Sequence, residues 1–233
     1  MRVVFAAKVP KLASEPELME DAYNAKHYRG LYAVSDGASE SYSSAAWART
    51  LVNHFVDNPG VTASWVAAAT KEYNSHFNPE TMSWSAQAAF DRGSFATLLG
   101  LQVSGDRARI LGIGDSLAVL VSEGRLVASC PYQDAEQFKS RPVLLSTAPE
   151  KNMALLAPGT MKRLTTVWNL RGFKSPTILM MTDAVGAWLL TDPDARLQRL
   201  LALPSRTAFA ALVEGERAAG NMRRDDSTLL QVA

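Results

Sequence analysis

The sequence contains a single cysteine, Cys130, among its 233 residues. One cysteine cannot form an intrachain disulfide, and scarce cysteine is typical of proteins from the reducing cytoplasm. We expect its side chain to act as a small buried hydrophobic group. The apolar start of the chain is short and reaches a charge at Lys8, so it does not have the pattern of a signal peptide. These features predict a cytoplasmic protein.

The sequence also lacks a basic stripe and a long apolar run. It has 24 Lys and Arg against 23 Asp and Glu, interspersed, for a net charge of +1. Nucleic acid is therefore not an expected partner. No apolar run approaches the roughly 18 residues that a membrane helix needs, so no membrane contact is expected. Apolar residues make up 47% and charged residues 20% of the chain, a balance typical of globular domains.

Turn residues divide the chain into strand-like and helical blocks. Alternating or β-branched patterns predict strands at residues 2–9, 20–23, 30–35, 94–103, 107–113, 117–121, 125–130, 160–170, 177–181 and 227–232. Helical periodicity and capping residues predict helices that start near Ser41 or Ser43, at Thr62, at Trp84, after Asp194 and at Thr207. Strands that flank an early and a late helical block favour an α+β sandwich.

Two stretches of the middle of the chain carry more specific predictions. The turns at 104–106, 114–116 and 123–124 predict that the four strands between 94 and 130 form one antiparallel meander. Residues 131–158 contain four prolines and predict an irregular surface insertion, a kind of segment that is often functional. No linker or repeat is present, so residues 1–233 are expected to form one domain.

The most informative stretch runs from Gly30 to Glu40, where a short apolar strand leads into Asp36-Gly37 and then a helix. A carboxylate at the end of a buried strand needs a cation or hydrogen-bond donors to offset its desolvation. The glycine permits a sharp turn that brings a carbonyl oxygen near the same ligand. Oxygen donors of this kind suit Mg²⁺ or Mn²⁺. By itself, however, Asp-Gly is also a common turn.

Other acidic residues share this placement at strand edges. They are Glu20-Asp21, Gly114-Asp115, Thr182-Asp183 and Asp225-Asp226. If these carboxylates converge, their mutual repulsion requires bound cations or shifted protonation. Convergence is what a two-metal carboxylate site needs.

In the order of these motifs the chain resembles the metal-dependent Ser/Thr protein phosphatases of type 2C, over nearly its whole length. The matching segments are Glu20-Asp21, Val34-Ser35-Asp36-Gly37, Gly93-Ser94-Phe95-Ala96, Gly114-Asp115-Ser116, Met181-Thr182-Asp183 and Arg224-Asp225-Asp226-Ser227-Thr228. No single motif is specific, but six in order are. The resemblance implies an α/β/β/α sandwich of two mainly antiparallel sheets flanked by helices.

The resemblance further implies two ions, Mg²⁺ or Mn²⁺, held between the sheets. Asp36 would bridge both ions, Asp183 and Asp225 would complete one site, and Glu20 with the Gly37 carbonyl would serve the other. For Asp21, direct ligation and a supporting role are both open. A hydroxide that bridges the metals would attack phosphoserine or phosphothreonine in a protein substrate, with a cognate Ser/Thr kinase as a further partner.

The chain departs from the family pattern at three places. Pro16 stands where many members have a phosphate-binding Arg, with Lys8, Lys11 or Arg29 as possible substitutes. Ala38 follows Asp36-Gly37 where relatives can have a His that protonates the leaving group. Ala187 replaces an Asp that supports a third metal, so Asp115 is either part of such a site or only a turn cap.

These departures keep other functions open. A catalytically weak or inactive module that binds a phosphoprotein is the main alternative to a phosphatase, and a small phosphorylated metabolite is an alternative substrate. Signatures of dinucleotide, P-loop and serine-hydrolase sites are absent, and His27, His54 and His76 lack zinc spacing.

Overall fold

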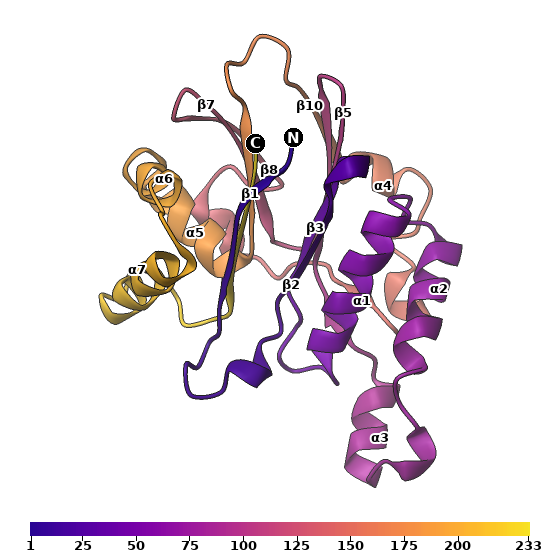
Figure 1. Cartoon of the computed structure of the whole chain (residues 1–233). Helices are drawn as coiled ribbons and strands as arrows, with labels where there is room; N and C mark the ends of the chain where they lie inside the picture. The colour runs from indigo at the N-terminus through magenta and orange to yellow at the C-terminus, as the bar shows by residue number, and fades with distance from the viewer.

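A computed structural model describes all residues, 1–233, and contains two five-stranded antiparallel sheets packed face to face (Figure 1). The first sheet has the order β1 (Val3–Val9), β12 (Ser227–Val232), β11 (Thr177–Met181), β7 (Leu117–Ser122) and β8 (Arg125–Cys130). The second has the order β10 (Thr165–Asn169), β6 (Arg107–Ile113), β5 (Leu98–Ser104), β3 (Leu31–Ser35) and β2 (Ala22–Lys26).

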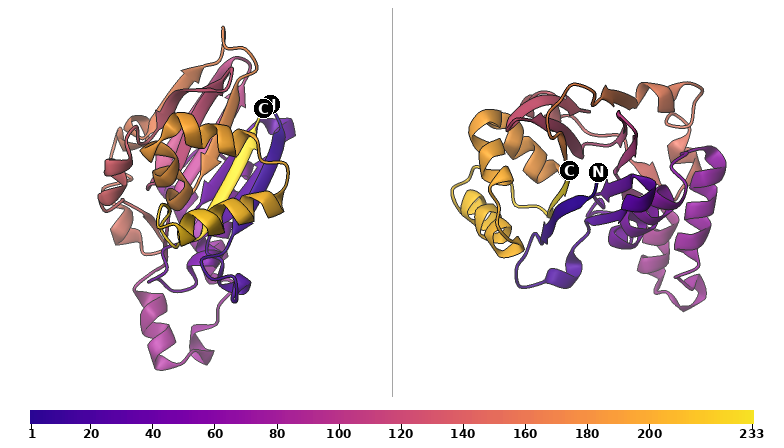
Figure 2. Two further views of the ribbon diagram at one scale, coloured as in Figure 1. Left: turned by 90° about the vertical axis from the view of Figure 1, so that its left-hand side faces the viewer. Right: turned by 45° about the horizontal axis from the view of Figure 1, so that its top comes forward.

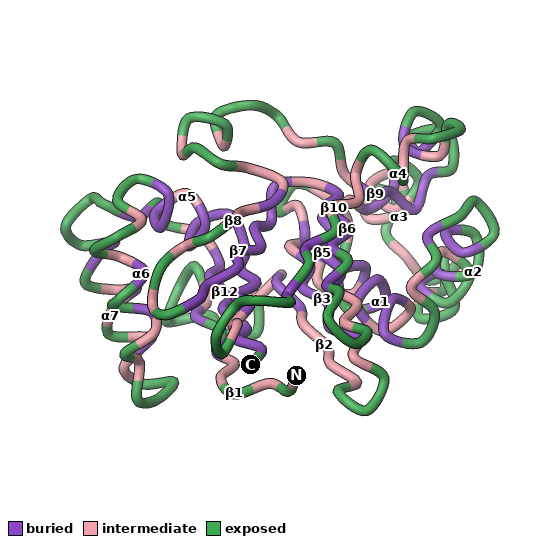
Figure 3. The backbone as a smooth tube through the Cα atoms, turned by 90° about the horizontal axis from the view of Figure 1, so that it is seen from above, coloured by how far each residue is buried: buried purple, intermediate pink, exposed green.

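Helices cover the outer face of each sheet, as the view along the sheets shows (Figure 3). On the second sheet lie α1 (Ser44–Asp57) and α2 (Ala63–Asn74). On the first sheet lie α5 (Asp183–Thr191), α6 (Pro193–Leu201) and α7 (Arg206–Ala218). The short helix α3 (Trp84–Asp91) extends away from the body of the molecule (Figures 1 and 2). The predicted α/β/β/α sandwich is therefore confirmed.

Three apolar clusters fill the spaces between these layers. Ile110, Leu120 and Met180 belong to the cluster between the two sheets, because alternate strand residues point to the inner faces. Trp47 and Trp188 anchor the clusters beneath the two helical layers, and both are almost completely buried. Burial of this apolar surface is the main favourable contribution to folding.

Local signals account for most helix starts. The Thr62 hydroxyl accepts a hydrogen bond from the Trp65 amide and caps α2, as predicted. The sixth helix begins earlier than predicted, with Asp192 instead of Asp194 as its cap, because Pro193 suits the first helical position. Ser43 precedes α1 but makes no side-chain cap bond.

Three sequence predictions about the elements were wrong, and one helix was missed. The segment 160–170 begins with a helical turn, α4 (Thr160–Arg163), before β10 starts. The predicted strand 94–103 is split into β4 (Phe95–Ala96) and β5. The helix α5 was not predicted. The predicted meander does not exist, because residues 114–116 carry the chain from the second sheet to the first instead of closing a hairpin.

The insertion at 131–158 is less superficial than predicted. It contains the short 3-10 helices Ala135–Lys139 and Pro149–Asn152 and the strand β9 (Leu145–Ser146), which pairs with β4. Leu145 is fully buried, and its carbonyl accepts a hydrogen bond from Trp47 Nε1 at 3.0 Å. The Asn152 side chain hydrogen-bonds the backbone of Ser146 in both directions. The second half of this segment thus belongs to the helical layer of the second sheet.

The strand register sends the predicted acidic motifs to one end of the sandwich. The two chain termini lie side by side at the other end, where Arg2 and Ala233 exchange backbone hydrogen bonds (Figure 2). Leu117 pairs with Met181, and Met181 pairs with Leu229. The motifs that follow β3 and β11, precede β12 and link β6 to β7 therefore share an end. No helix is long and apolar enough to cross a membrane.

Candidate active site

A cavity of about 480 Å³ opens at the end of the sandwich opposite the termini. Five acidic residues and one arginine line it: Asp36, Glu40, Asp115, Asp183, Asp225 and Arg223. The remaining lining comes from residues 37–39 and from Thr97, Pro142 and Leu144. Three of the six charged residues, Asp183, Arg223 and Asp225, come from the loops of the first sheet, so the cavity lies between the ends of the two sheets.

Asp36 is held at the junction of β3 and the loop before α1. Its amide donates to Thr97 Oγ1 at 2.8 Å, and its carbonyl accepts from the Thr97 amide at 2.9 Å. A side chain at Gly37 would come within 2.8 Å of the Ser44 backbone, so only glycine allows this approach to α1. The backbone thereby fixes the Asp36 carboxylate at the cavity.

Asp115 lies on the crossover between the sheets and is almost completely buried. The adjacent Ser116 hydroxyl hydrogen-bonds Thr97 Oγ1 at 2.8 Å. Thr97 therefore ties the Asp36 loop to the crossover. Asp115 is one of the residues that line the cavity, and both interpretations, a third metal site and a turn cap, stay predictions.

Asp183 and Asp225 face each other through Arg223. Asp183 begins α5 directly after β11 and is almost completely buried, while the partly buried Asp225 precedes β12. One guanidinium nitrogen, Arg223 Nη2, pairs with Asp183 Oδ2 and lies 3.3 Å from Asp225 Oδ2. The second Asp183 oxygen, Oδ1, is buried without a hydrogen-bond partner.

Glu20 and Asp21 lie beside this cavity and do not line it. The Glu20 carboxylate accepts hydrogen bonds from the Ser39 and Ser44 hydroxyls and borders a neighbouring cavity of about 320 Å³. Asp21 is buried, and its Oδ2 accepts from Thr182 at 2.9 Å and from Thr228 at 2.6 Å. Those two threonines flank Asp183 and Asp225, so Asp21 supports the loops that carry the cavity carboxylates.

The anchoring roles of two residues, Asp226 and Arg217, were not predicted from the sequence. Asp226 accepts the Lys11 and Glu20 amides, both at 2.6 Å, and fastens the loop between β1 and β2 to the start of β12. The buried Arg217 side chain donates to the Pro10 carbonyl at 2.9 Å and to the Asp225 carbonyl. A second Asp after Asp225 was the only available signal. Arg217 gave none, because its spacing in α7 is that of any surface arginine.

Like charges and burial shift the protonation of the cavity. Burial, together with the charges of Asp21 and Asp115, raises the pKa of Asp36 well above its usual range. Burial also raises the pKa of Asp115. Burial raises the pKa of Asp21 to about 7, although the hydrogen bond from Thr228 opposes this shift. These acids therefore keep their protons to higher pH than usual, because burial and neighbouring carboxylates disfavour their charged forms.

The donor set fits hard divalent cations in kind, because every donor is an oxygen and one buried Asp183 oxygen has no partner. As arranged here, no group of three or more His, Cys, Asp or Glu side chains is positioned to hold a metal ion. Instead, two of the carboxylates, Asp183 and Asp225, form ion pairs with Arg223. Asp36, Asp183 and Asp225 thus line one cavity, and their roles as metal ligands stay a prediction.

Of the three proposed phosphate-binding cations, Lys11 lies nearest to a cavity carboxylate, with its Nζ 3.7 Å from Asp225 Oδ1. Lys8 Nζ donates to the Asp21 carbonyl at 3.0 Å. Arg29 donates to the Val56 and Asp57 carbonyls at the end of α1 and is excluded from this role.

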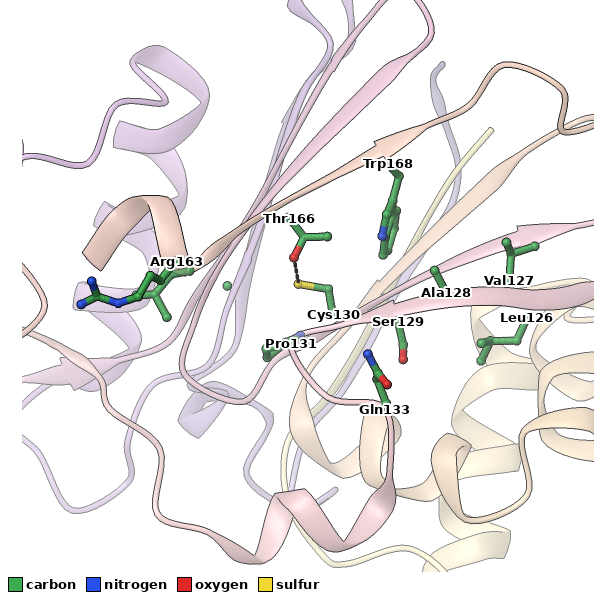
Figure 4. A pocket seen from close by; sticks show the side chains of 12 residues that line it. Leu126, Val127, Ala128, Ser129, Cys130, Pro131, Gln133, Arg163, Thr166 and Trp168 are labelled. Carbon is green, nitrogen blue, oxygen red and sulfur yellow. Dashed lines mark hydrogen bonds between the residues drawn. The ribbon is translucent and has the colours of Figure 1, made fainter. Parts of the chain in front are cut away.

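A larger cavity, of about 540 Å³, lies elsewhere, between the edge strands β8 and β10 (Figure 4). Its lining includes Cys130, Thr166 and Trp168, with Arg163 at its side. Cys130 Sγ donates to Thr166 Oγ1 at 3.2 Å, and burial raises the pKa of the thiol. Cys130 is buried, as predicted. No carboxylate lines this cavity, so the candidate site is the smaller one.

The fold and the strand-end carboxylates define a class: the chain has the fold of serine/threonine protein phosphatases of type 2C. The photosystem II phosphatase PBCP matches with a TM-score of 0.61 at 16% identity over 97% of each chain. PppA, a regulatory component of T6SS in Pseudomonas aeruginosa, matches with a TM-score of 0.60 at 16% identity over 99% of this chain and 97% of its own.

A third similar structure contains metal. The catalytic domain of the serine/threonine protein phosphatase PstP, in complex with two manganese ions, has a TM-score of 0.55 at 18% identity over 98% of this chain and 97% of its own. No family sequence model matches the chain, and no curated protein matches it in sequence. The likeness is one of fold, at identities where sequence similarity has almost vanished.

Proposed function

We propose that this protein is a Mg²⁺- or Mn²⁺-dependent phosphatase that acts on phosphoserine or phosphothreonine in proteins. The observation that supports this proposal most strongly is the cavity itself. Five acidic residues line it, the carboxylate of Asp183 has a buried oxygen without a partner, and burial together with neighbouring carboxylates raises the pKa of Asp36. Perturbed acids in a cleft are typical of functional sites. Similar folds belong to phosphatases, one with manganese bound.

In this proposal Asp36, Asp183 and Asp225 hold the cations, with the Gly37 carbonyl and Glu20 toward the second position. Divalent cations bound there would supply Lewis-acid activation of water and neutralise charge on the phosphoryl oxygens. Asp21 acts as a positioning residue, because its carboxylate holds the Thr182 and Thr228 hydroxyls beside the two loops. Residues next to ligands commonly orient them in this way.

The chain's own cations would orient the substrate. Lys11 is about half exposed and lies at the rim beside Asp225. An ammonium group there can bind a phosphate oxygen as a point charge. With Ala38 after Gly37, no side chain at that position can protonate the leaving group. Protonation of the leaving group by water would then be needed.

The test is hydrolysis of a phosphothreonine peptide and of p-nitrophenyl phosphate by EDTA-stripped protein with Mn²⁺ or Mg²⁺ restored. We expect metal-dependent turnover that Asp36→Asn and Asp183→Asn each reduce at least about 100-fold, since even outer residues of metal sites contribute 10–100-fold. Asp106→Asn serves as the matched control. This exposed residue pairs only with Arg171 in the turn between β5 and β6, at the other end of the sheets.

The result would contradict the proposal if folded protein showed no turnover with either metal. Activity on p-nitrophenyl phosphate alone would retain the phosphatase and reject the phosphoprotein substrate. A second function, a phosphoprotein-binding module without catalysis, is favoured by one observation: no three acidic side chains are arranged around a metal position. Binding of the phosphopeptide without hydrolysis would support that alternative.

A further inference from the structure

Arg223 occupies the space between two of the proposed metal ligands. Its guanidinium pairs with Asp183 and lies 3.3 Å from Asp225. It is the only Lys or Arg among the residues that line the carboxylate cavity.

The two partners of this ion pair, Arg223 and Asp183, differ in how exposed their side chains are. The Asp183 side chain is 6% exposed and fixed at the start of α5, whereas the Arg223 side chain is 54% exposed. Arg223 lies outside regular structure, in the segment between α7 and β12. The carboxylates thus belong to the framework, and the guanidinium reaches them from the solvent side on a long flexible side chain.

We propose that Arg223 is a built-in competitor for the divalent cation: its guanidinium neutralises Asp183 and Asp225 in the metal-free protein and must leave before a metal binds. The inference rests on the proposed metal site. A guanidinium cannot lose its proton in a protein, so this internal cation is always available. It differs from a metal in carrying one charge and in presenting donors only from one side.

The incomplete pairing gives the exchange its driving force. One guanidinium satisfies Asp183 Oδ2 and leaves the buried Oδ1 without a partner. It also leaves Asp36 and Asp115, which line the same cavity, without an ion-pair partner. A divalent cation carries more charge into the same space. Metal would therefore displace the arginine, but at a reduced apparent affinity.

The size of that reduction follows from the populations. A ligand that binds only one of two conformations has its apparent affinity lowered by the fraction of molecules in that conformation. If Arg223 is paired in most metal-free molecules, its removal should tighten metal binding by about tenfold or more, the scale of a charge-assisted hydrogen bond. The exposed, displaced side chain would then lie at the cavity mouth.

Calorimetric titration of Mn²⁺ into EDTA-stripped protein tests this directly. Arg223→Gln should bind Mn²⁺ about tenfold or more tighter than the unchanged protein. The matched control is Arg224→Gln, which removes the same charge from the next residue. Arg224 is exposed and makes no ion pair, so its replacement should change the affinity less than about twofold.

Thermal unfolding gives a second readout that separates competition from a purely structural role. Without metal, Arg223→Gln should unfold at a lower temperature, because two carboxylates lose their counter-charge. With saturating Mn²⁺ that deficit should disappear. Arg223→Lys keeps the charge but cannot bridge two carboxylates, so its Mn²⁺ affinity should fall between the two. It also covers the case in which the Gln variant does not fold.

Equal or weaker Mn²⁺ binding by Arg223→Gln would overturn the inference, as would equal tightening by Arg224→Gln. No Mn²⁺ binding by any variant would overturn it too, since removal of the arginine would then not open a metal site. Failure of the proposed function is distinguishable. If Mn²⁺ binds with the expected order of affinities but no phosphopeptide or p-nitrophenyl phosphate is hydrolysed, the phosphatase is rejected and the competition remains.

Discussion

Glu216 and Asp183 are both buried carboxylates paired with an arginine, and they differ in what else surrounds them. Glu216 in α7 accepts hydrogen bonds from Trp188 Nε1 at 2.9 Å, Arg199 Nη1 at 2.6 Å and Asn221 Nδ2 at 3.1 Å. Asp183 has Arg223 on one oxygen and no partner on the other. Hydrogen-bond donors thus compensate both oxygens of the buried Glu216 carboxylate, whereas one oxygen of the buried Asp183 carboxylate has no donor.

The acids of the two regions also shift their pKa values in opposite directions. Hydrogen bonds from Trp188 and Arg199 lower the pKa of Glu216. Burial and neighbouring carboxylates raise the pKa of Asp36. A charge with a full set of partners stabilises a fold, whereas a group of charges that lacks them is stable only with an added cation or proton. The contrast separates structural charge from functional charge within one molecule.

The largest expected effect is at Asp36, where one substitution should lower the activity and raise the stability of the metal-free protein. Asp36→Asn should reduce metal-dependent phosphatase activity at least about 100-fold. The same change should raise the unfolding temperature of the metal-free protein, because it removes one of several repelling buried charges. Activity assays and thermal unfolding with EDTA measure both. A variant that is inactive and also less stable without metal would contradict the view that this charge is uncompensated.

The stability of metal-free protein should depend on pH through Asp21. Its pKa is 3.8 in the unfolded chain and about 7 in the fold. Between these values the folded state holds a proton that the unfolded state has lost. The free energy of unfolding therefore falls as pH rises from about 4 to about 7, by at most about 1.4 kcal/mol per pH unit from this group.

Chemical denaturation with EDTA across this range measures that slope. Asp21→Asn mimics the protonated carboxyl and should flatten the slope and be more stable than the unchanged protein at pH 8. Asp106→Asn, at the exposed turn, should leave the slope as it is. An unchanged slope in Asp21→Asn would show that Asp21 is ionised throughout, with Thr182 and Thr228 as sufficient partners.

At Glu216 the expectation is reversed. Glu216→Gln keeps the shape but loses the charge that Arg199 pairs with, so it should lower the free energy of unfolding by about 1–3 kcal/mol. Mn²⁺ affinity and turnover should stay unchanged, because the residue lies in the helical layer and not at the cavity. Denaturant unfolding and calorimetry measure the two. A changed Mn²⁺ affinity would erase the separation between the regions.

The sequence predicted the acidic motifs because each follows or precedes an apolar strand, a local pattern that survives without any alignment. It did not predict α5, since most of its residues are apolar and buried, and a helix buried all round has no amphipathic period. The crossover at 114–116 was missed because Gly-Asp-Ser is turn chemistry in a hairpin and in a sheet-to-sheet link alike.

The role of Arg223 was also beyond the sequence. Two adjacent arginines before two aspartates are typical of a solvated loop, and only the fold brings one of them to Asp183, 40 positions earlier. Glu20 shows the opposite limit. The sequence indicates its place at a strand edge, but the Ser39 and Ser44 hydroxyls that hold its carboxylate come from the loop before α1 and from the first residue of α1, whose approach to Glu20 no local pattern specifies.

The smallest expected effect concerns the larger cavity between β8 and β10. Cys130→Ser keeps a hydroxyl-sized donor toward Thr166 and should change Mn²⁺ affinity and turnover less than about twofold, because no charge of the metal site is touched. Calorimetry and the phosphopeptide assay on this variant measure both quantities. A loss comparable to that of Asp183→Asn would mean that the two cavities are coupled. The larger cavity would then have to be counted as part of the functional site, although no carboxylate lines it.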